Sequence, residues 1–463
     1  MSAFCDDVLG TADAVEVARR IRSGEVRASE AVEAAIARAE RVNPSLNALA
    51  TPLFESARER ARRAGGGAFA GVPSFIKDTD PVAGSPYLFG SRGLPREPAA
   101  KSSPFVEQFL SLGLINLGKT TLSEFGLTGT TEAVVYGRTH NPWKRGFSPG
   151  GSSGGSAALV AAGVVPIAHA NDGGGSTRIP ASCCGLVGLK PSRGRLVEFE
   201  GTRLMPVRLQ HQGMVSRSVR DTAVFYHAAE QAHRNPKLPE IGLVTRPGRR
   251  LRIGVYSGMG AGEPAHPDCV AGVTEIAELC QGLGHVVEEV APPFDEDFHE
   301  DFLLLWSMMA FAIAQFGRQL VHPEFDRNGL EDFTEGLARH FRANITKAPG
   351  AIRRLRSFGR RHGEHFYTYD VLMCPTMATP PPEHGYIGPE VPFETALERM
   401  RWMVPFTPVQ NVSGEPALSL PLATSRDGLP IGIQFVSKMG AERTLLELAF
   451  ELEEASPWRT LAR

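Results

Sequence analysis

The sequence is most informative at Ser148-Pro-Gly-Gly-Ser-Ser-Gly-Gly-Ser156 and at Asn171-Asp-Gly-Gly-Gly-Ser-Thr-Arg-Ile-Pro180. Each stretch places a serine, Ser152 or Ser176, in a glycine cluster, and an apolar segment of small residues (157–168) joins them. This segment is long enough for a helix and a short strand, which would bring both serines to one site. The glycines before Ser176 leave backbone N–H groups unshielded, so these groups can converge on a developing oxyanion, whose stabilisation usually dominates acyl-transfer catalysis.

A lysine stands near the end of a short apolar run upstream, Val72-Pro-Ser-Phe-Ile-Lys-Asp78. The run has the composition and length of a buried strand. Burial disfavours the charged form of an amine, so Lys77 can serve as a base near neutral pH. Lys77, Ser152 and Ser176 are therefore candidate catalytic residues.

These residues resemble the motifs of the amidase signature hydrolases, a family that uses a Ser-Ser-Lys triad. The resemblance covers essentially the whole chain. The matching segments are residues 77–78, 149–156, 172–181, 185–194, 217–221, 411–417 and 427–435.

Carried over by position, the resemblance implies that Ser176 is the nucleophile, Ser152 the bridging serine on a cis peptide, and Lys77 the base. It implies a hydrolase that cleaves amide C–N bonds through an acyl-enzyme, with no metal and no organic cofactor. It also implies one large α/β/α layered domain over residues 1–463, built around a central mixed, twisted sheet. The expected oxyanion-hole amides are those of Gly173, Gly174, Gly175 and Ser176.

Three further residues are expected to support the site without touching substrate. Asp172 and Arg178 flank the nucleophile and predict an ion pair that braces the glycine loop. Ser153 is either a small residue that allows close backbone approach or a donor of a supporting hydrogen bond. Thr177, Asn171 and Met214 differ from the residues that are commoner in the family at these positions. None of these differences removes a catalytic group, so we expect them to affect the fit of the substrate rather than the chemistry.

The composition excludes several classes of protein. The chain has 463 residues, is 42% hydrophobic and carries a formal net charge of −2, which provides no overall field to attract nucleic acid or an anionic membrane. The acidic start Met1-Ser-Ala-Phe-Cys-Asp-Asp7 is unlike a secretory signal, and no apolar run is long enough to span a membrane. Six scattered cysteines without a C-x-x-C pair fit cytosolic thiols. We expect a cytoplasmic enzyme of a small-molecule substrate; a homodimer is left open.

Apolar periodicity divides the chain into regions. Residues 1–65 predict N-terminal helices, and residues 66–230 alternate short apolar runs with helical segments, as in an α/β catalytic core. Residues 299–366 are mostly helical. Their first part, 302–314, is apolar nearly all round, which predicts a helix that is buried or lines an apolar cavity.

Three motifs are better explained without a function of their own. Residues 113–120 match the phosphate loop G-x-x-x-x-G-K-T, but a predicted helix precedes the first glycine and a strand follows it, the wrong order for that loop. Residues 150–154 match G-x-S-x-G, but no strand precedes them. The basic run 353–362 fits the solvated face of a helix better than a polyanion site.

The helix around residues 302–314 leads to a prediction about substrate. Phe302, Leu305, Trp306, Met309, Phe311 or Ile313 would surround an apolar acyl or aryl group, so amides, anilides and aryl carbamates are expected. The residues predicted to bind substrate are Thr130, Trp306, Met309 and Phe311. The alternative function is the glutaminase subunit of a tRNA-dependent amidotransferase, which shares the triad. It is less favoured, because glutaminase members typically carry an Arg and a Tyr where this chain is apolar.

Overall fold

The computed structural model describes residues 1–63, 65–199, 201–202, 205–259, 264–295 and 297–462. The strands are β1 (Leu49–Pro52), β2 (Pro73–Lys77), β3 (Ile115–Thr120), β4 (Ile167–Asp172), β5 (Val187–Lys190), β6 (His211–Ser216), β7 (Arg252–Val255), β8 (Val286–Glu289), β9 (Val371–Pro375), β10 (Ala417–Thr424) and β11 (Pro430–Ser437). The helices are α1 (Ala14–Arg22), α2 (Ala28–Leu46), α3 (Phe54–Ala61), α4 (Pro104–Ser111), α5 (Gly154–Ala161), α6 (Arg178–Cys184), α7 (Val219–Ala232), α8 (Pro267–Gly282), α9 (Phe298–Leu320), α10 (Asp332–Asn344), α11 (Ala348–Gly363), α12 (Phe393–Met403), α13 (Pro408–Ser413) and α14 (Glu442–Ala455).

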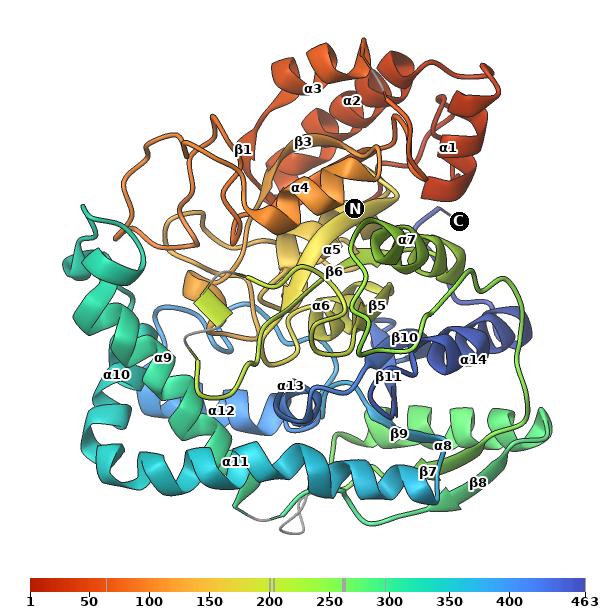
Figure 1. Ribbon diagram of the computed structural model, residues 1–463. Helices are drawn as coiled ribbons and strands as arrows, with labels where there is room; N and C mark the ends of the chain where they lie inside the picture. Colours follow the sequence, from red (N-terminus) through yellow and green to blue (C-terminus); the bar gives the residue numbers. More distant parts are fainter. Residues whose placement is uncertain (64, 200, 203–204, 260–263, 296, 463) are drawn as a thin grey trace.

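A mixed sheet of eight strands occupies the centre, in the order β4-β6-β5-β10-β11-β9-β7-β8 (Figure 1). The pairs β9–β7 and β7–β8 are parallel and the other pairs are antiparallel. A smaller sheet has the order β1-β3-β2, with β2 parallel and β1 antiparallel to β3. The predicted α/β class with a large mixed sheet is therefore confirmed.

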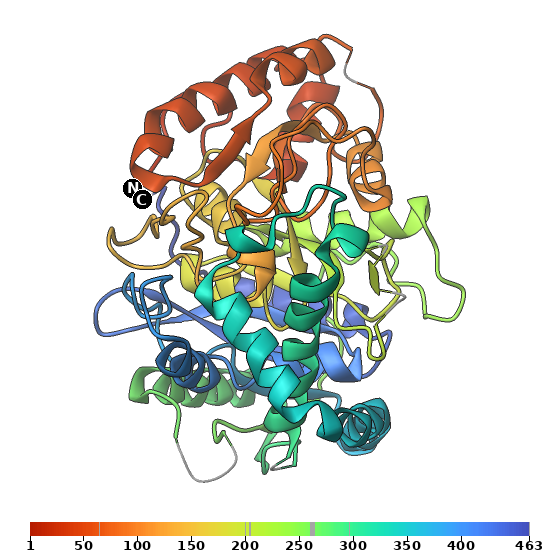
Figure 2. The ribbon, with the colours of Figure 1, turned by 90° about the vertical axis from the view of Figure 1, so that its left-hand side faces the viewer.

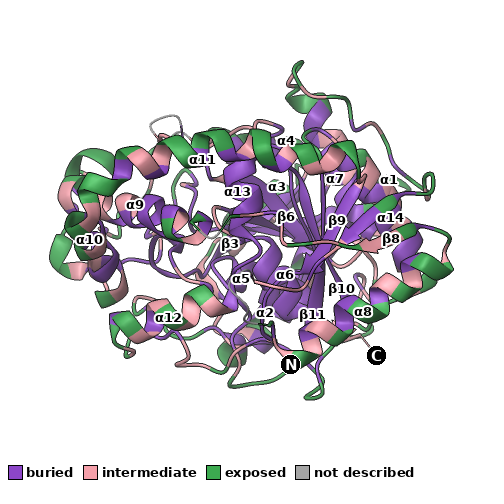
Figure 3. Cartoon of the chain, turned by 90° about the horizontal axis from the view of Figure 1, so that it is seen from below, coloured by how far each residue is buried: buried purple, intermediate pink, exposed green. Residues whose placement is uncertain are grey.

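Helices cover both faces of the large sheet. A Cβ on Gly432 of β11 would lie 2.6 Å from Cβ of Ser182 on α6. The next residue, Ile433, reaches towards Gly272 of α8 on the other side. Because successive strand residues point to opposite faces, α6 and α8 lie on opposite sides of the sheet. Seen from below, the strands are buried in the middle and the helices expose their outer sides (Figure 3).

Side chains connect the small sheet to the large one. Ser74 Oγ of β2 donates a hydrogen bond to the backbone oxygen of Ile167 at 2.9 Å. The backbone N–H of Lys77 donates to Nδ1 of His169, also on β4, at 3.2 Å. These two bonds hold the end of β2 beside β4, and this contact positions the lysine.

Helices α9, α10 and α11 pack around a second hydrophobic cluster, which includes Phe298, Trp306, Leu337 and Leu355. Figure 2 shows α9 and α10 in front of the body of the protein. Within residues 299–366 these helices follow one another, with turns and short 3-10 segments between them. The two termini lie side by side in Figure 2, and Ser2 Oγ donates to the backbone oxygen of Leu461 at 3.0 Å.

The short strand expected at the end of the segment 157–168 begins only at Ile167 and continues to Asp172. Helix α5 is followed by Gly163 with a φ of +85°, a left-handed conformation that ends the helix in a turn. Pro166 then precedes the strand and has no N–H to donate to a sheet partner. The region 1–65 contains the predicted helices and also strand β1, where no strand is predicted from the sequence.

Candidate active site

Lys77 is the last residue of β2 and its side chain is fully buried. Its Nζ lies 2.7 Å from Oγ of Ser152 and 2.6 Å from Oδ1 of Asn171. Burial lowers the pKa of Lys77 from its ordinary value to about 7, although the negative charges of Asp172 and Asp80 act in the opposite direction. The amine can therefore exist unprotonated near neutral pH.

Ser152 precedes helix α5 and is almost completely buried. The peptide bond between Gly151 and Ser152 is cis. A Cβ on Gly151 would lie only 2.5 Å from the backbone oxygen of Thr130, so this position requires glycine for close approach of the backbone. The predicted substrate-binding residue Thr130 thus lies behind the serine loop, with its side chain buried.

Ser176 lies in the loop between β4 and α6 and is 7% exposed. Together with Gly151 and Gly174, it lines an apolar cavity of about 70 Å³. The structure thus places Ser176 at the same cavity as Gly151, the residue that precedes Ser152. No hydrogen bond between the described residues joins the two serine hydroxyls, whereas Lys77 and Ser152 are joined directly.

The glycine loop has two kinds of backbone amide. The N–H of Gly175 donates to Oδ1 of Asp172 at 2.8 Å, so it is already occupied. The N–H groups of Gly173, Gly174 and Ser176 have no hydrogen-bond partner among the described residues. Of the four amides predicted for the oxyanion hole, the Gly175 amide is thus bonded within the protein, and the other three are left as candidates. Thr407 fixes the loop from the other side by donating to the backbone oxygen of Gly174 at 2.6 Å.

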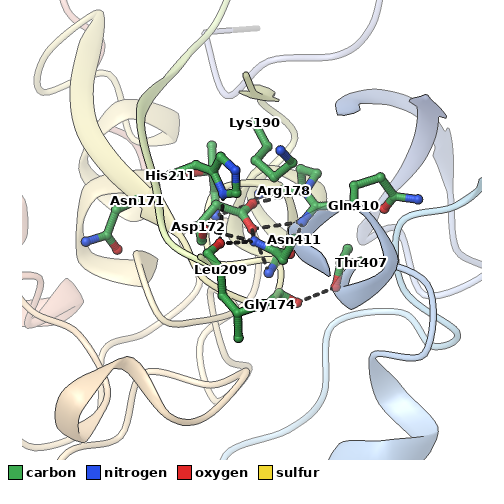
Figure 4. A network of polar contacts seen from close by, with 12 residues as sticks. Asn171, Asp172, Gly174, Arg178, Lys190, Leu209, His211, Thr407, Gln410 and Asn411 are labelled. Atoms are coloured by element: carbon green, nitrogen blue, oxygen red, sulfur yellow. Dashed lines mark hydrogen bonds and ion pairs between the residues drawn. The ribbon is translucent and has the colours of Figure 1, made fainter. Parts of the chain in front are cut away.

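A buried ion pair braces the loop, as the sequence predicts. Arg178 Nη2 lies 2.8 Å from Oδ1 of Asp172, and its Nε lies 3.0 Å from Oδ2. Asn411 of α13 donates to the same carboxylate at 2.9 Å (Figure 4). Burial alone would raise the pKa of Asp172, but the charge and hydrogen bonds of Arg178 outweigh it, so this pKa lies well below its usual value. Both groups hold the loop and neither lines the cavity.

Two amides of the C-terminal region complete the support of Arg178. Its Nη1 donates to Oε1 of Gln410 at 3.0 Å and to Oε1 of Gln434 at 2.7 Å. Ser153 contributes one hydrogen bond to the support of the site: its Oγ donates to the backbone oxygen of Asn171 at 3.3 Å. In the sequence, the segment around Asn411 stands out only through the family resemblance, and no local pattern predicts these contacts.

Aromatic side chains from α9 form one wall of the cavity. Phe302 and Trp306, four residues apart and hence on one helix face, stack with their ring centroids 5.6 Å apart. Of the predicted substrate-binding residues, only Trp306 lines this cavity. Those placed outside its wall are Thr130, Met309 and Phe311, and so are Leu305 and Ile313.

Phe311 shows why the helix segment is not uniformly a cavity wall. Its ring packs 5.2 Å from that of Phe341 on α10, and the guanidinium of Arg342 lies over it. Five residues after Trp306, it lies on a different face of the helix and binds α9 to α10. An apolar sequence all round the helix reflects packing on several sides, which sequence alone does not separate from cavity lining.

A wider groove of about 1010 Å³ lies outside the cavity and shares His299, Leu397 and Arg401 with it. Arg401 forms an ion pair with Glu300. The wall common to the cavity and the wider groove is therefore part apolar and part charged.

The three motifs set aside in the sequence have the predicted structural context. Lys119 and Thr120 lie within β3, and Lys119 forms a buried ion pair with Asp78 at 2.5 Å, so no phosphate loop is present there. No described strand leads into residues 150–154. The basic run lies on α11, which buries its apolar side through Leu355 and Phe358.

The described residues contain no group of three or more His, Cys, Asp or Glu side chains arranged to hold a metal ion. Within the same described part of the chain, no helix is both long and apolar enough for a membrane span.

Comparison with known proteins places this site in a family. The amidase family model matches residues 30–446. A protein of Mycobacterium leprae that bears the amidase name AmiC is 50% identical over 462 residues, covering 98% of this chain and 97% of the relative. A solved 6-aminohexanoate cyclic dimer hydrolase with bound substrate superimposes with a TM-score of 0.87 at 32% identity, covering 98% of this chain and 99% of that one.

A bacterial aryl acylamidase of the amidase signature family superimposes with a TM-score of 0.84 at 26% identity, with 96% of each chain covered. The family model and the relatives thus agree over almost the entire length. The chain belongs to the amidase signature family of hydrolases, which act on amide C–N bonds.

Proposed function

We propose that this amidase uses Ser176 as nucleophile, Ser152 as proton carrier and Lys77 as base. The observation that carries the proposal is the hydrogen bond of 2.7 Å between a fully buried lysine and Ser152, beside the cavity that Ser176 lines. The pKa of about 7 at Lys77 supports the role of a base, because a sizeable fraction of the amine is neutral at neutral pH.

In the proposed reaction, neutral Lys77 accepts the proton of the Ser152 hydroxyl while Ser152 accepts that of Ser176. The Ser176 oxygen then attacks the carbonyl carbon, and the negative oxygen that results receives hydrogen bonds from the amides of Gly173, Gly174 and Ser176. The C–N bond breaks as Ser152 gives a proton to the departing nitrogen and receives one from protonated Lys77, which returns to its neutral form. Water hydrolyses the remaining ester and frees Ser176. Each step uses groups of this chain, substrate and water.

We propose small apolar amides, including acyl anilides and aryl carbamates, as substrates. The apolar cavity with the stacked rings of Phe302 and Trp306 favours an aryl or alkyl group over a charged one. The aryl acylamidase and the cyclic-dimer hydrolase among the similar structures support this class. A cytoplasmic location, a small-molecule substrate and the option of a homodimer remain part of the proposal.

The glutaminase alternative is less favoured on a specific observation. Among the described residues, Arg401 is the one arginine that lines the cavity of Ser176, and it is paired with Glu300. Free glutamine carries a carboxylate and an ammonium group, both of which need buried partners.

The test is kcat/KM on an acyl nitroanilide and an aryl carbamate against glutamine and acetamide, with Ser176→Ala as control for background hydrolysis. We expect turnover of the first pair and none of glutamine. A preference for glutamine and acetamide would contradict the proposed substrate class, and activity in the Ser176→Ala enzyme would contradict the proposed nucleophile.

A further inference from the structure

The side chain of Asn171 is the second partner of Lys77. On β4 it points away from the Asp172 network, on the opposite side of the strand (Figure 4). Its Oδ1 lies 2.6 Å from Nζ of Lys77, and its Nδ2 lies 2.8 Å from Oγ1 of Thr79. Oγ1 of Thr79 in turn lies 3.1 Å from Oδ2 of Asp80. A continuous chain of hydrogen bonds thus runs from the carboxylate to the lysine.

The direction of each bond follows from the carboxylate at the end. An ionised carboxylate only accepts hydrogen bonds, so the Thr79 hydroxyl must donate its proton to Asp80. The Thr79 oxygen is then left as an acceptor for Asn171, which must present its NH₂ group to it. The amide oxygen of Asn171 consequently faces Lys77, and it can only accept.

We propose that Asn171 is a positioning residue for Lys77: its oxygen holds one N–H of the amine and so turns the nitrogen lone pair towards Ser152. A neutral amine has two N–H bonds and one lone pair, and only the lone pair can take a proton from Ser152. Without a fixed acceptor at residue 171, the lone pair is free to point elsewhere. This inference rests on the proposed function, in which Lys77 is the base.

Three titratable groups face this arrangement. Asp172 and Asp80 both act on Lys77 through their charge, and His169 beneath it accepts the lysine backbone N–H. Burial lowers the pKa of His169 to about 4, which favours the neutral imidazole near neutral pH. Asn171 is neutral as well, and it orients the amine without adding a third negative charge, which would favour the protonated, inactive form.

The experiment measures kcat and KM against pH for the full-length enzyme on one nitroanilide substrate. Asn171→Leu removes the acceptor, and we expect plateau kcat to fall by about 10-fold or more, within the range for a general base, with KM little changed. Asn171→Asp keeps the shape but adds charge, and should move the acid limb of the profile upward by about one pH unit, with activity regained at alkaline pH.

Thr79→Val removes the hydroxyl that fixes the amide direction and should lower plateau kcat while leaving the Asn171 side chain in place. Thr222→Val is the matched control, because this buried threonine bonds to Ser216 on a strand away from the cavity. Melting temperatures confirm that each variant is folded. If Asn171→Leu does not fold, the isosteric Asn171→Asp decides the question by its pH profile.

Either of two results would overturn the inference. One is an unchanged acid limb in Asn171→Asp, and the other is a plateau kcat in Asn171→Leu within about twofold of wild type. A general base that contributes about 10²–10⁴-fold to the rate would then need no orientation from residue 171. The failure of this inference and that of the proposed function are distinguishable. An inactive Lys77→Ala enzyme supports the triad whatever the residue 171 variants show, whereas an active one overturns both.

Discussion

Lys77 and Ser152 are joined by a hydrogen bond of 2.7 Å between Nζ and Oγ, across 75 residues of sequence. The lysine ends a strand of the small sheet, and the serine precedes a helix that contacts both sheets. Neither residue is exposed enough to exchange this partner for water. The bond therefore depends on the relative position of the two sheets.

The activity should rise with pH through about 7 and then level off. Burial lowers the pKa of Lys77 to about 7, and the amine works as a base only when it is unprotonated, so the active fraction grows as pH increases past this value. The measurement is kcat/KM from pH 5 to 10 on a nitroanilide. An optimum on the acid side would contradict lysine as the base.

Ser176→Ala should abolish both turnover and covalent labelling by a fluorophosphonate, because this serine adjoins the unpaired amides of the glycine loop. Labelling is followed by intact-protein mass spectrometry, with Ser152→Ala in parallel. Were Ser176→Ala still labelled and Ser152→Ala not, the roles of the two serines would have to be exchanged.

Two neighbouring glycines should respond differently to alanine. A Cβ on Gly174 would make ordinary contact with Phe302 at 3.4 Å inside the cavity, so Gly174→Ala should keep the melting temperature and lower kcat/KM. A Cβ on Gly175 would lie 2.3 Å from Oγ1 of Thr407, at a φ of +131°, so Gly175→Ala should destabilise the protein. Thermal melts and kinetics on both variants check this. Equal melting temperatures would contradict the packing described here.

Replacement of the buried acid of the loop should cost stability. Asp172→Asn leaves Arg178 charged and fully buried without its counter-ion, and we expect a loss of about 3–5 kcal/mol in the free energy of unfolding. Urea denaturation measures it. The surface pair Arg443–Glu447 serves as control, since its removal by Glu447→Gln should cost less than about 1 kcal/mol. Equal losses would show that the buried pair has no special weight.

Trp306 should set the preference for aromatic substrates. Trp306→Ala removes a cavity wall and should raise KM for nitroanilides more than for acetamide. Phe311→Ala provides the contrast, because that ring packs on Phe341 rather than on the cavity. A change of selectivity in Phe311→Ala would restore the sequence-based prediction for Phe311 and argue against the placement seen here.

The glycine clusters and Lys77 could be recognised from sequence because their chemistry needs specific residue types at specific places. The strand with Lys77, the helix after Ser152 and the helices of residues 299–366 follow from local apolar patterns, and the structure contains them. The catalytic roles of Lys77, Ser152 and Ser176 stay predictions until they are tested.

Other features depend on contacts that no local pattern encodes. Gly175 belongs to the same Gly-Gly-Gly run as Gly174. Its amide is bonded to Asp172, whereas the Gly174 amide has no hydrogen-bond partner among the described residues, and only the folded geometry distinguishes the two. Met309 and Phe311 have the same apolar character as Trp306, but helix rotation and the position of α10 decide which of them meets the cavity. Asn171 stood out as a departure from the family wording, and only its contact with Lys77 suggests a reason for it.

Arg178 receives its hydrogen-bond acceptors from distant parts of the chain: Asp172 lies six residues before it, while Gln410 and Gln434 follow 232 and 256 residues later. A nascent chain that stops short of Gln434 already contains all three candidate catalytic residues but lacks one of the acceptors that hold this guanidinium. Assembly of the active site is thus tied to the completion of synthesis. A product truncated before its last strand is therefore expected to be inert rather than partially active, although it carries every candidate catalytic residue.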